Sequence, residues 1–290
     1  MRKTISLWML GIMAMLASCS QNEDVLQNAT TDGETAQVKI SVQAPQQPVQ
    51  TRADVSSALT RYVCEVYEGA DATGTVSNHY ESATGSFTME LKKNTAYSFL
   101  FWADKGTPAA GETPSSGKYN VASLKAVSMT EGGEEGYSGS ILNKTITATD
   151  NEGLSVTLKH AVAKITIENT IDLTDATGNK LTVTYPQTVT FNVGTEGITT
   201  TDTPVSRTFD VAQAKGIVVT DYIFAPKDEA QLGNLKLKLN EEAEKTIANV
   251  PVQLNYITRI KGALSNYYNS TFSVSSSVDD FGSGSVNPIN

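Results

Sequence analysis

The segment LSVTLKHAVAKITI, residues 154–167, decides how the fold divides. Leu154, Val156 and Leu158 alternate with polar residues, as in a β-strand with one buried face. The apolar positions then change phase and continue through the odd-numbered residues from 161 to 167. Such a phase change predicts a bulge, or a strand that passes from one sheet to another. We therefore expect a domain joint near residue 160.

The rest of the chain is a series of short strand patterns separated by Gly, Asn, Asp and Pro turns. Residues 97–103 are apolar on both faces, which predicts a central, buried strand. Short helices are expected at 121–127 and 210–214, and a loop at 131–139. Many short strands without a long amphipathic repeat indicate an all-β protein of two sandwiches. The predicted strands are residues 38–42, 62–68, 85–91, 96–103, 144–148, 154–167, 180–185, 188–193, 217–224, 235–239, 250–262 and 271–278.

Composition limits the function. The 290 residues are 39% hydrophobic, which is enough for a core, and 22 Lys+Arg against 31 Asp+Glu give a net charge of −9. An acidic chain repels phosphate backbones, so no nucleic-acid partner is expected. Two His and two Cys exclude zinc fingers, disulfide scaffolds and most metal ligand sets. We expect no metal and no cofactor.

Catalytic motifs are missing from the sequence. It has no His-Glu-x-x-His, Gly-x-Ser-x-Gly, Cys-x-x-Cys or phosphate-binding loop, and no calcium loop. His160 stands alone at a strand bend, which favours a structural role. Cys64 shares a strand face with Tyr62 and Val66, which favours a buried thiol over a nucleophile. No catalytic residue is predicted, and the protein is not expected to be an enzyme.

The first 18 residues resemble a secretory signal peptide. Arg2 and Lys3 precede a mostly apolar stretch at 5–17, which is too short to span a bilayer as a helix. It ends in Leu-Ala-Ser-Cys, similar to a bacterial lipobox, so Cys19 is the expected lipidation site at the outer membrane. The polar, acidic residues 20–24 resemble an export signal to the cell surface of Bacteroidetes. The alternative is an ordinary signal peptide in which Cys19 is incidental.

Five further segments together resemble the fimbrillin-like lipoproteins of Bacteroidales, from the lipobox to about residue 275. This resemblance implies two tandem transthyretin-like (Greek-key) β-sandwiches and a role as a pilus subunit, or type V pilin, in adhesion and biofilms. It also implies trimming after an Arg by a trypsin-like surface protease, then polymerisation by strand exchange. The segments are YSFLFWAD (97–104), LKHAVAKITI (158–167), TVTFNV (188–193), YIFAP (222–226) and VPVQLNYITRIKG (250–262).

Arg52, followed by Ala53, matches the trimming position of that family. Arg61 is a second candidate by residue type, but a cut there would encroach on the strand that holds Cys64. Cleavage after Arg52 would release residues 19–52, a lipidated tether with a removable strand. The expected divisions are 1–18 signal peptide, 19–52 tether and strand, 53–160 and 161–278 two sandwiches, and 279–290 a C-terminal tail.

The removable strand carries Val38, Ile40 and Val42 on one face. Its loss would leave an apolar groove with unpaired backbone groups, which a strand from another subunit could refill. The candidate donor is the C-terminal strand that carries Phe272, Val274 and Val278. The expected partners are other copies of the chain or related pilins in a head-to-tail filament, which does not close on itself.

The alternative function is a membrane-anchored surface lipoprotein that binds a glycan or host ligand and never sheds residues 19–52. Sugar sites stack rings on exposed aromatic side chains. After signal removal the only Trp is Trp102, within a run that predicts a buried strand. Tyr267 and Tyr268 are adjacent and would point to opposite faces of a strand. The pilus subunit is therefore the leading interpretation.

Overall fold

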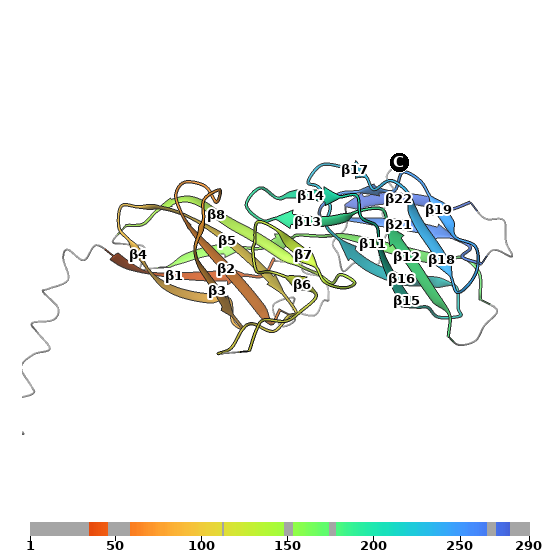
Figure 1. The fold of residues 1–290 in the computed structure, drawn as a ribbon, viewed down its shortest axis with the longest axis horizontal. Helices are drawn as coiled ribbons and strands as arrows, with labels where there is room; N and C mark the ends of the chain where they lie inside the picture. The colour runs from red at the N-terminus through yellow and green to blue at the C-terminus, as the bar shows by residue number, and fades with distance from the viewer. Residues whose placement is uncertain are drawn as a thin grey trace, which may run out of the picture.

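The computed structural model describes residues 35–45, 59–111, 113–147, 153–173, 178–265 and 271–278. In these ranges the regular secondary structure consists of β-strands alone, and the strands form two β-sandwiches in tandem (Figure 1). The predicted all-β, two-sandwich class is therefore confirmed. In chain order the strands are β1 (Thr35–Gln43), β2 (Arg61–Glu68), β3 (Val76–Ser82), β4 (Ser86–Lys92), β5 (Ala96–Asp104), β6 (Tyr119–Asn120), β7 (Val127–Met129), β8 (Tyr137–Thr145), β9 (Leu154–Thr157), β10 (Lys159–His160), β11 (Ala163–Asn169), β12 (Lys180–Tyr185), β13 (Thr188–Asn192), β14 (Gly197–Thr201), β15 (Val205–Asp210), β16 (Gly216–Ile223), β17 (Ala230–Gln231), β18 (Leu235–Leu239), β19 (Lys245–Ile247), β20 (Pro251–Val252), β21 (Tyr256–Gly262) and β22 (Ser273–Val278).

The first sandwich packs a three-stranded sheet, β4-β1-β9, against a five-stranded sheet, β10-β8-β5-β2-β3. Strand β5 lies between β8 and β2, and residues 97–104 are all buried. The prediction of a central, buried strand at this position is confirmed. Its apolar residues on both faces are needed because this sheet is covered on both sides.

An aromatic cluster covers the second face of the five-stranded sheet. Trp102 of β5 lies 4.9 Å from Tyr119 and 6.2 Å from Phe224, measured between ring centroids. Phe191 stacks on Phe224 at 5.5 Å. Phe191 and Phe224 come from the later half of the chain, so this cluster joins the two halves through apolar packing.

The segment at 154–167 passes between three sheets. Strand β9 pairs with β1, β10 pairs with β8, and β11 pairs with β16 and β21. The phase change in the sequence therefore marks a transfer between sheets, as predicted. The later strand β13 pairs with β7, so the sheet β14-β13-β7-β6 takes strands from both sides of residue 160. The exact boundary at residue 160 stays a prediction.

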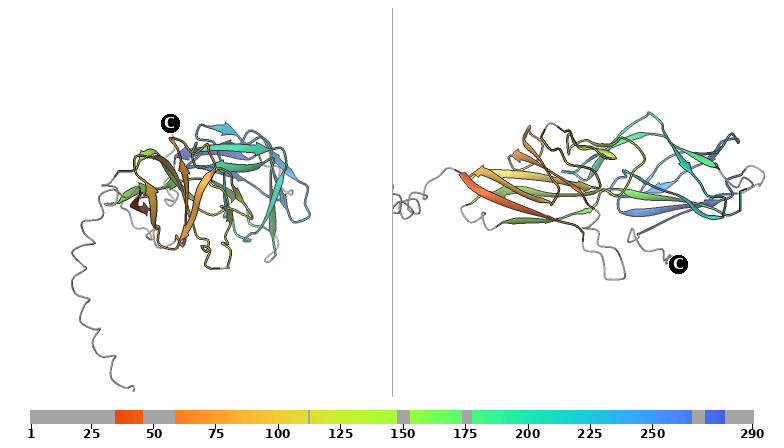
Figure 2. Two further views of the ribbon diagram at one scale, coloured as in Figure 1. Left: turned by 60° about the vertical axis from the view of Figure 1, so that its left-hand side comes forward. Right: turned by 90° about the horizontal axis from the view of Figure 1, so that it is seen from below.

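The second sandwich packs the sheet β16-β11-β21-β22 against β15-β12-β18-β19. The views in Figure 2 show it continuing the long axis of the first sandwich, so that β1 and β22 lie in opposite halves of an elongated molecule. Strands β12 and β18 have the predicted bounds. Their alternating Leu and Val side chains face the core, while their Lys and Thr residues lie on the other face.

The two predicted helices are wrong. Residues 121–126 form turns, because the Leu124 N–H donates to the buried Glu65 carboxylate at 3.0 Å and the Leu124 carbonyl accepts from Val193 N–H at 2.9 Å. At 210–214 the chain leaves β15 at Asp210 and passes into a bend, with Val211 N–H donating to Asn179 O at 3.0 Å. Partners distant in sequence supply the hydrogen bonds that a helix would have formed locally.

Strand β8 starts inside the predicted loop at 131–139. Its Gly139 lies against β9 and the residue after it: a Cβ there would be 3.0 Å from a Val156 methyl group and 3.1 Å from one of Leu158. The glycine that indicated a loop is needed for close packing. The predicted strand at 250–262 is divided into β20 and β21 by residues 253–255, where Asn255 has a φ of +65°.

Candidate functional site

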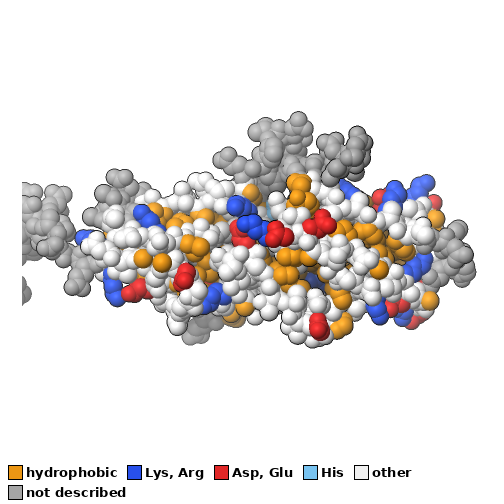
Figure 3. Space-filling view, turned by 90° about the horizontal axis from the view of Figure 1, so that it is seen from above, with side chains coloured by type: hydrophobic (Ala, Val, Ile, Leu, Met, Phe, Trp, Pro, Cys, Tyr) orange, Lys and Arg blue, Asp and Glu red, His pale blue; other side chains and the backbone are white. Residues whose placement is uncertain are grey.

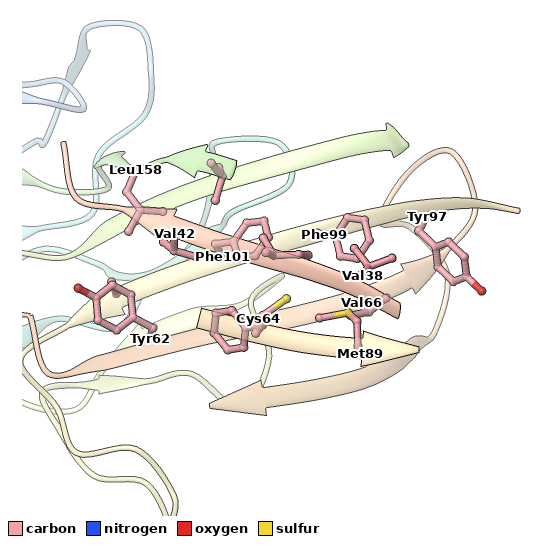
Figure 4. Close-up of a cluster of buried hydrophobic side chains, with 14 of the residues drawn as sticks. Val38, Val42, Tyr62, Cys64, Val66, Met89, Tyr97, Phe99, Phe101 and Leu158 are labelled. Carbon is pink, nitrogen blue, oxygen red and sulfur yellow. The ribbon is translucent and has the colours of Figure 1, made fainter. Parts of the chain in front are cut away.

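Strand β1 is the N-terminal strand of the described chain and lies inside the first sandwich. Its burial alternates at every residue. The buried side chains are Ala36, Val38, Ile40 and Val42, with 8%, 0%, 2% and 8% of their surface exposed. The predicted apolar face is therefore present, and Ala36 extends it by one position. Figure 4 shows Val38 and Val42 pointing into the core from β1.

The backbone of β1 holds its sheet together. It pairs antiparallel with β4, from Thr35↔Lys92 to Ser41↔Ser86, and parallel with β9, from Ile40↔Leu154 to Gln43↔Thr157. In the described ranges neither β4 nor β9 has another partner in its sheet. Removing β1 would thus separate these two strands and leave unpaired N–H and C=O groups on both. We call the space that β1 occupies between β4 and β9 the β1 slot.

The floor of the β1 slot is apolar. Cys64 and Val66 of β2, Phe99 and Phe101 of β5, and Met89 of β4 belong to the same buried cluster as the inward side chains of β1. All are at most 4% exposed. Cys64 is buried in this core, as predicted, and burial raises the pKa of its thiol. A strand that enters this slot must present apolar side chains.

A buried ion pair anchors the chain where β2 begins. The Arg61 Nε donates to Asp104 Oδ1 at 2.9 Å, and a second guanidinium nitrogen bonds the other carboxylate oxygen. The same guanidinium donates to Ser115 Oγ at 2.7 Å and to Tyr119 O at 3.0 Å. Arg61 is 1% exposed. In the folded chain Arg61 is therefore not accessible to a protease, and cleavage after Arg52 stays a prediction.

The predicted lipidation and processing residues lie outside the described residues. These are Cys19, Arg52 and Ala53, together with the tail 279–290. Arg52 and Ala53 fall between the described segment that contains β1, which ends at residue 45, and the next one, which begins at residue 59. Chain cleavage at Arg52 would therefore separate β1 from β2 covalently while Arg61 keeps β2 in place. The role of Arg61 was missed in the sequence because its partner, Asp104, is 43 residues away.

Strand β22, the predicted donor, is an edge strand of the second sandwich. It pairs only with β21 in the described ladder, from Lys261↔Ser273 to Tyr256↔Val278. Phe272 and Val274 are half-buried and pack against the second core, whereas Val278 is 68% exposed. A Cβ at Gly262 would lie 2.6 Å from the Phe272 ring, so glycine is required there. Phe272 and Val274 thus pack against the core of the second sandwich, to which β22 itself belongs, and Val278 does not.

A second ion pair, between Arg207 and Asp221, lies at the joint between the two halves. Arg207 donates to Asp221 Oδ2 at 2.6 Å and to Tyr222 O at 3.0 Å, and its guanidinium carbon lies 5.1 Å from the Tyr185 ring centroid. It borders a cavity of about 50 Å³ that Met129 also lines. Asp221 neutralises its charge, so the cavity offers no unpaired cation for a ligand.

Among the described residues, no three His, Cys, Asp or Glu side chains are placed to hold a metal ion. Over those same ranges no helix has the length and apolarity to cross a membrane. The face in Figure 3 carries Lys or Arg close to Asp or Glu in small groups, without a basic patch. The β1 slot is therefore the candidate functional site.

A protein family model matches residues 29–280, which is most of the chain and includes both β1 and β22. The chain belongs to the family of unknown function DUF6562. No significant match was found among curated proteins.

Several solved structures are similar in outline to this DUF6562 member. A candidate cell adhesion protein from Bacteroides uniformis ATCC 8492 is 15% identical, with 84% of this chain and 99% of that chain covered and a TM-score of 0.48. The tip fimbrial protein Mfa3 of Porphyromonas gingivalis, with a C-terminal truncation, is 12% identical, with coverage of 83% and 99% and a TM-score of 0.42. The fimbrial anchor protein Mfa2 of Porphyromonas gingivalis is 9% identical, with coverage of 83% and 95% and a TM-score of 0.42.

Proposed function

We propose that this DUF6562 protein is a structural subunit of a surface fimbrium, assembled by exchange of β1 for a strand of another subunit. On this proposal it is exported as a lipoprotein through Cys19, held at the outer membrane, and trimmed between Arg52 and Ala53. The single observation that carries the proposal is the position of β1. It is the central strand of its sheet, yet its covalent link to the strands that follow it is a single segment, the one that contains Arg52.

The energetics support replacement rather than simple loss. Burial of Val38, Ile40 and Val42 contributes about 1.5–3 kcal/mol each, or about 5–9 kcal/mol before ordering costs. Once β1 is cut free, an incoming strand recovers this burial together with the ladder to β4 and β9. An empty β1 slot would expose Cys64, Phe99 and Phe101 to water, so the cut subunit has a strong drive to accept a strand.

Strand exchange also requires a donor strand, which one subunit inserts into the β1 slot of the next. Strand β22, with Phe272, Val274 and Val278, is the proposed donor, because it is an edge strand with only partly buried apolar side chains. It lies in the opposite half of the molecule from the β1 slot (Figure 1). With a slot in one half and a donor strand in the other, each subunit contacts one neighbour through each, and such head-to-tail contacts extend into a filament.

The test is substitution of the processing residue. Cells that carry Arg52→Ala should keep the lipid on the subunit, and the subunit should be absent from high-mass ladders on unboiled gels. Thr51→Ala is the matched control, since it changes the same segment and keeps the Arg. Ladders of unchanged intensity with Arg52→Ala would contradict the proposal. They would favour the alternative, an anchored lipoprotein that binds a glycan or host ligand with β1 in place.

A further inference from the structure

The β1 slot has a size pattern that a replacing strand must match. Four alternate positions face the core, occupied in order by Ala36, Val38, Ile40 and Val42. The two middle positions are the deepest, at 0% and 2% exposure, and the outer two are each 8% exposed. A suitable strand therefore presents large apolar side chains at both middle positions and at one outer position at least.

The C-terminal residues of this chain do not provide such a pattern. In residues 266–290, no three consecutive alternate positions carry apolar side chains other than Gly or Pro. The longest run is Phe272 with Val274, after which Ser276 interrupts the face before Val278. In β1 the corresponding run has four members.

Ser276 falls on a deep position of the β1 slot whether the C-terminal strand is inserted parallel or antiparallel to the direction of β1. The register that brings three apolar side chains of the C-terminal strand into the slot aligns Phe272 through Val278 with positions 36 through 42. In the direction of β1, this places Ser276 at the position of Ile40. In the opposite direction, it places Ser276 at the position of Val38. The serine always falls on one of the two deepest positions.

The slot offers nothing to a serine. The described side chains that form its floor are apolar, so the hydroxyl would be buried without a partner and an aliphatic side chain would be missing. In its own sandwich Ser276 lies opposite Thr258 of β21, and its Oγ is buried there without a hydrogen-bond partner. Entry into the β1 slot would not relieve that cost, and it would add the loss of the aliphatic side chain of Val38 or Ile40.

We infer that the β1 slot of this subunit takes its strand from a different protein, not from residues 266–290 of a second copy of this chain. The inference rests on the proposed strand exchange and adds the identity of the partner. That partner supplies a strand with β-branched or similarly sized apolar residues at three consecutive alternate positions, as β1 does. The subunit then joins two unlike neighbours and does not form a shaft of identical copies.

The test uses the full chain cut at Arg52 and a fluorescent peptide of residues 35–45 that has exchanged into the β1 slot. Unlabelled peptides compete for the slot, and fluorescence anisotropy reports displacement. The competitors are the 35–45 peptide, the 270–280 peptide, and the 270–280 peptide with Ser276→Ile. The matched control is the 270–280 peptide with Ser275→Ile, which adds the same side chain on the face that points away from the core.

The wild-type 270–280 peptide should compete about 100-fold more weakly than the 35–45 peptide, and Ser276→Ile should recover most of that difference. The Ser275→Ile peptide should stay weak. Competition by the wild-type 270–280 peptide within about 10-fold of the 35–45 peptide would overturn the inference and leave strand exchange standing. If the labelled 35–45 peptide itself never enters the slot, then strand exchange fails and the inference fails with it.

Discussion

Truncation of Ile40 separates two roles for β1, as a permanent core strand and as a strand that is later replaced. Ile40 is 2% exposed and lies at the centre of the β1 slot. Replacing a buried Ile by Ala costs about 2–5 kcal/mol, because the lost methyl groups leave a cavity. We expect Ile40→Ala to lower the free energy of unfolding of the uncut chain by that amount. The neighbouring Lys39→Ala, on the exposed face, should change it by less than about 0.5 kcal/mol.

The assay is urea unfolding of the chain without its signal segment, followed by the fluorescence of Trp102. This is the only Trp outside that segment, and it lies on the sheet that forms the floor of the first core. The midpoint should move to lower urea for Ile40→Ala and stay in place for Lys39→Ala. Equal midpoints for the two variants would refute the packing of β1 that the structure describes.

The cut chain gives the second half of the test. After cleavage at Arg52, the β1 fragment with Ile40→Ala should bind about 30-fold or more weakly than the wild-type fragment, which corresponds to at least 2 kcal/mol. On the exchange model β1 is absent from assembled material, so the amount of that material should be the same for Ile40→Ala and the wild type. A loss of ladders in proportion to the loss of stability would mean that β1 remains in the filament, and the exchange model would be wrong.

Three further outcomes follow from particular contacts. Cys64 should resist thiol reagents in the uncut chain, react after cleavage and release of β1, and be protected again by added 35–45 peptide, as read by mass spectrometry. Arg61→Ala should cost about 3–5 kcal/mol in thermal unfolding, because it leaves the Asp104 carboxylate buried without its cation, whereas Arg52→Ala should cost almost nothing. A hydrogen bond to Glu65 raises the pKa of His79 above 6.5, so the protonated form stabilises the fold. That contribution is complete below pH 6.5 and is lost as the pH rises through the raised value; urea midpoints should fall over this range and His79→Gln should flatten the fall.

The sequence predicts strands well where one face or both faces are buried. Strands β2, β5, β12 and β18 have nearly the predicted bounds because their apolar side chains follow a period of two or fill both faces. Strands β14 and β15 were missed because they lie at the edges of their sheets and consist mainly of Gly, Thr, Ser and charged residues. Such edges are defined by backbone pairing, which leaves little trace in the side-chain pattern.

The candidate site shows the same division. The face of Val38, Ile40 and Val42 was predicted from alternation alone, and the structure places it in the core. Alternation does not predict which strands pair with β1. Its partners β4 and β9 lie about 50 and 115 residues further along the chain, and their pairing with β1 depends on the tertiary fold. The exclusion of Arg61 as a cleavage point likewise required its contact with Asp104.

The central claim, that β1 leaves and another strand replaces it, is tested most directly by the composition of assembled material. High-mass material is isolated from intact cells, dissociated by boiling, and analysed by intact mass and N-terminal sequence. The account predicts a subunit that begins at Ala53 and lacks Val38, Ile40 and Val42. Subunits in that material that begin at a lipidated Cys19 and retain β1 would contradict it.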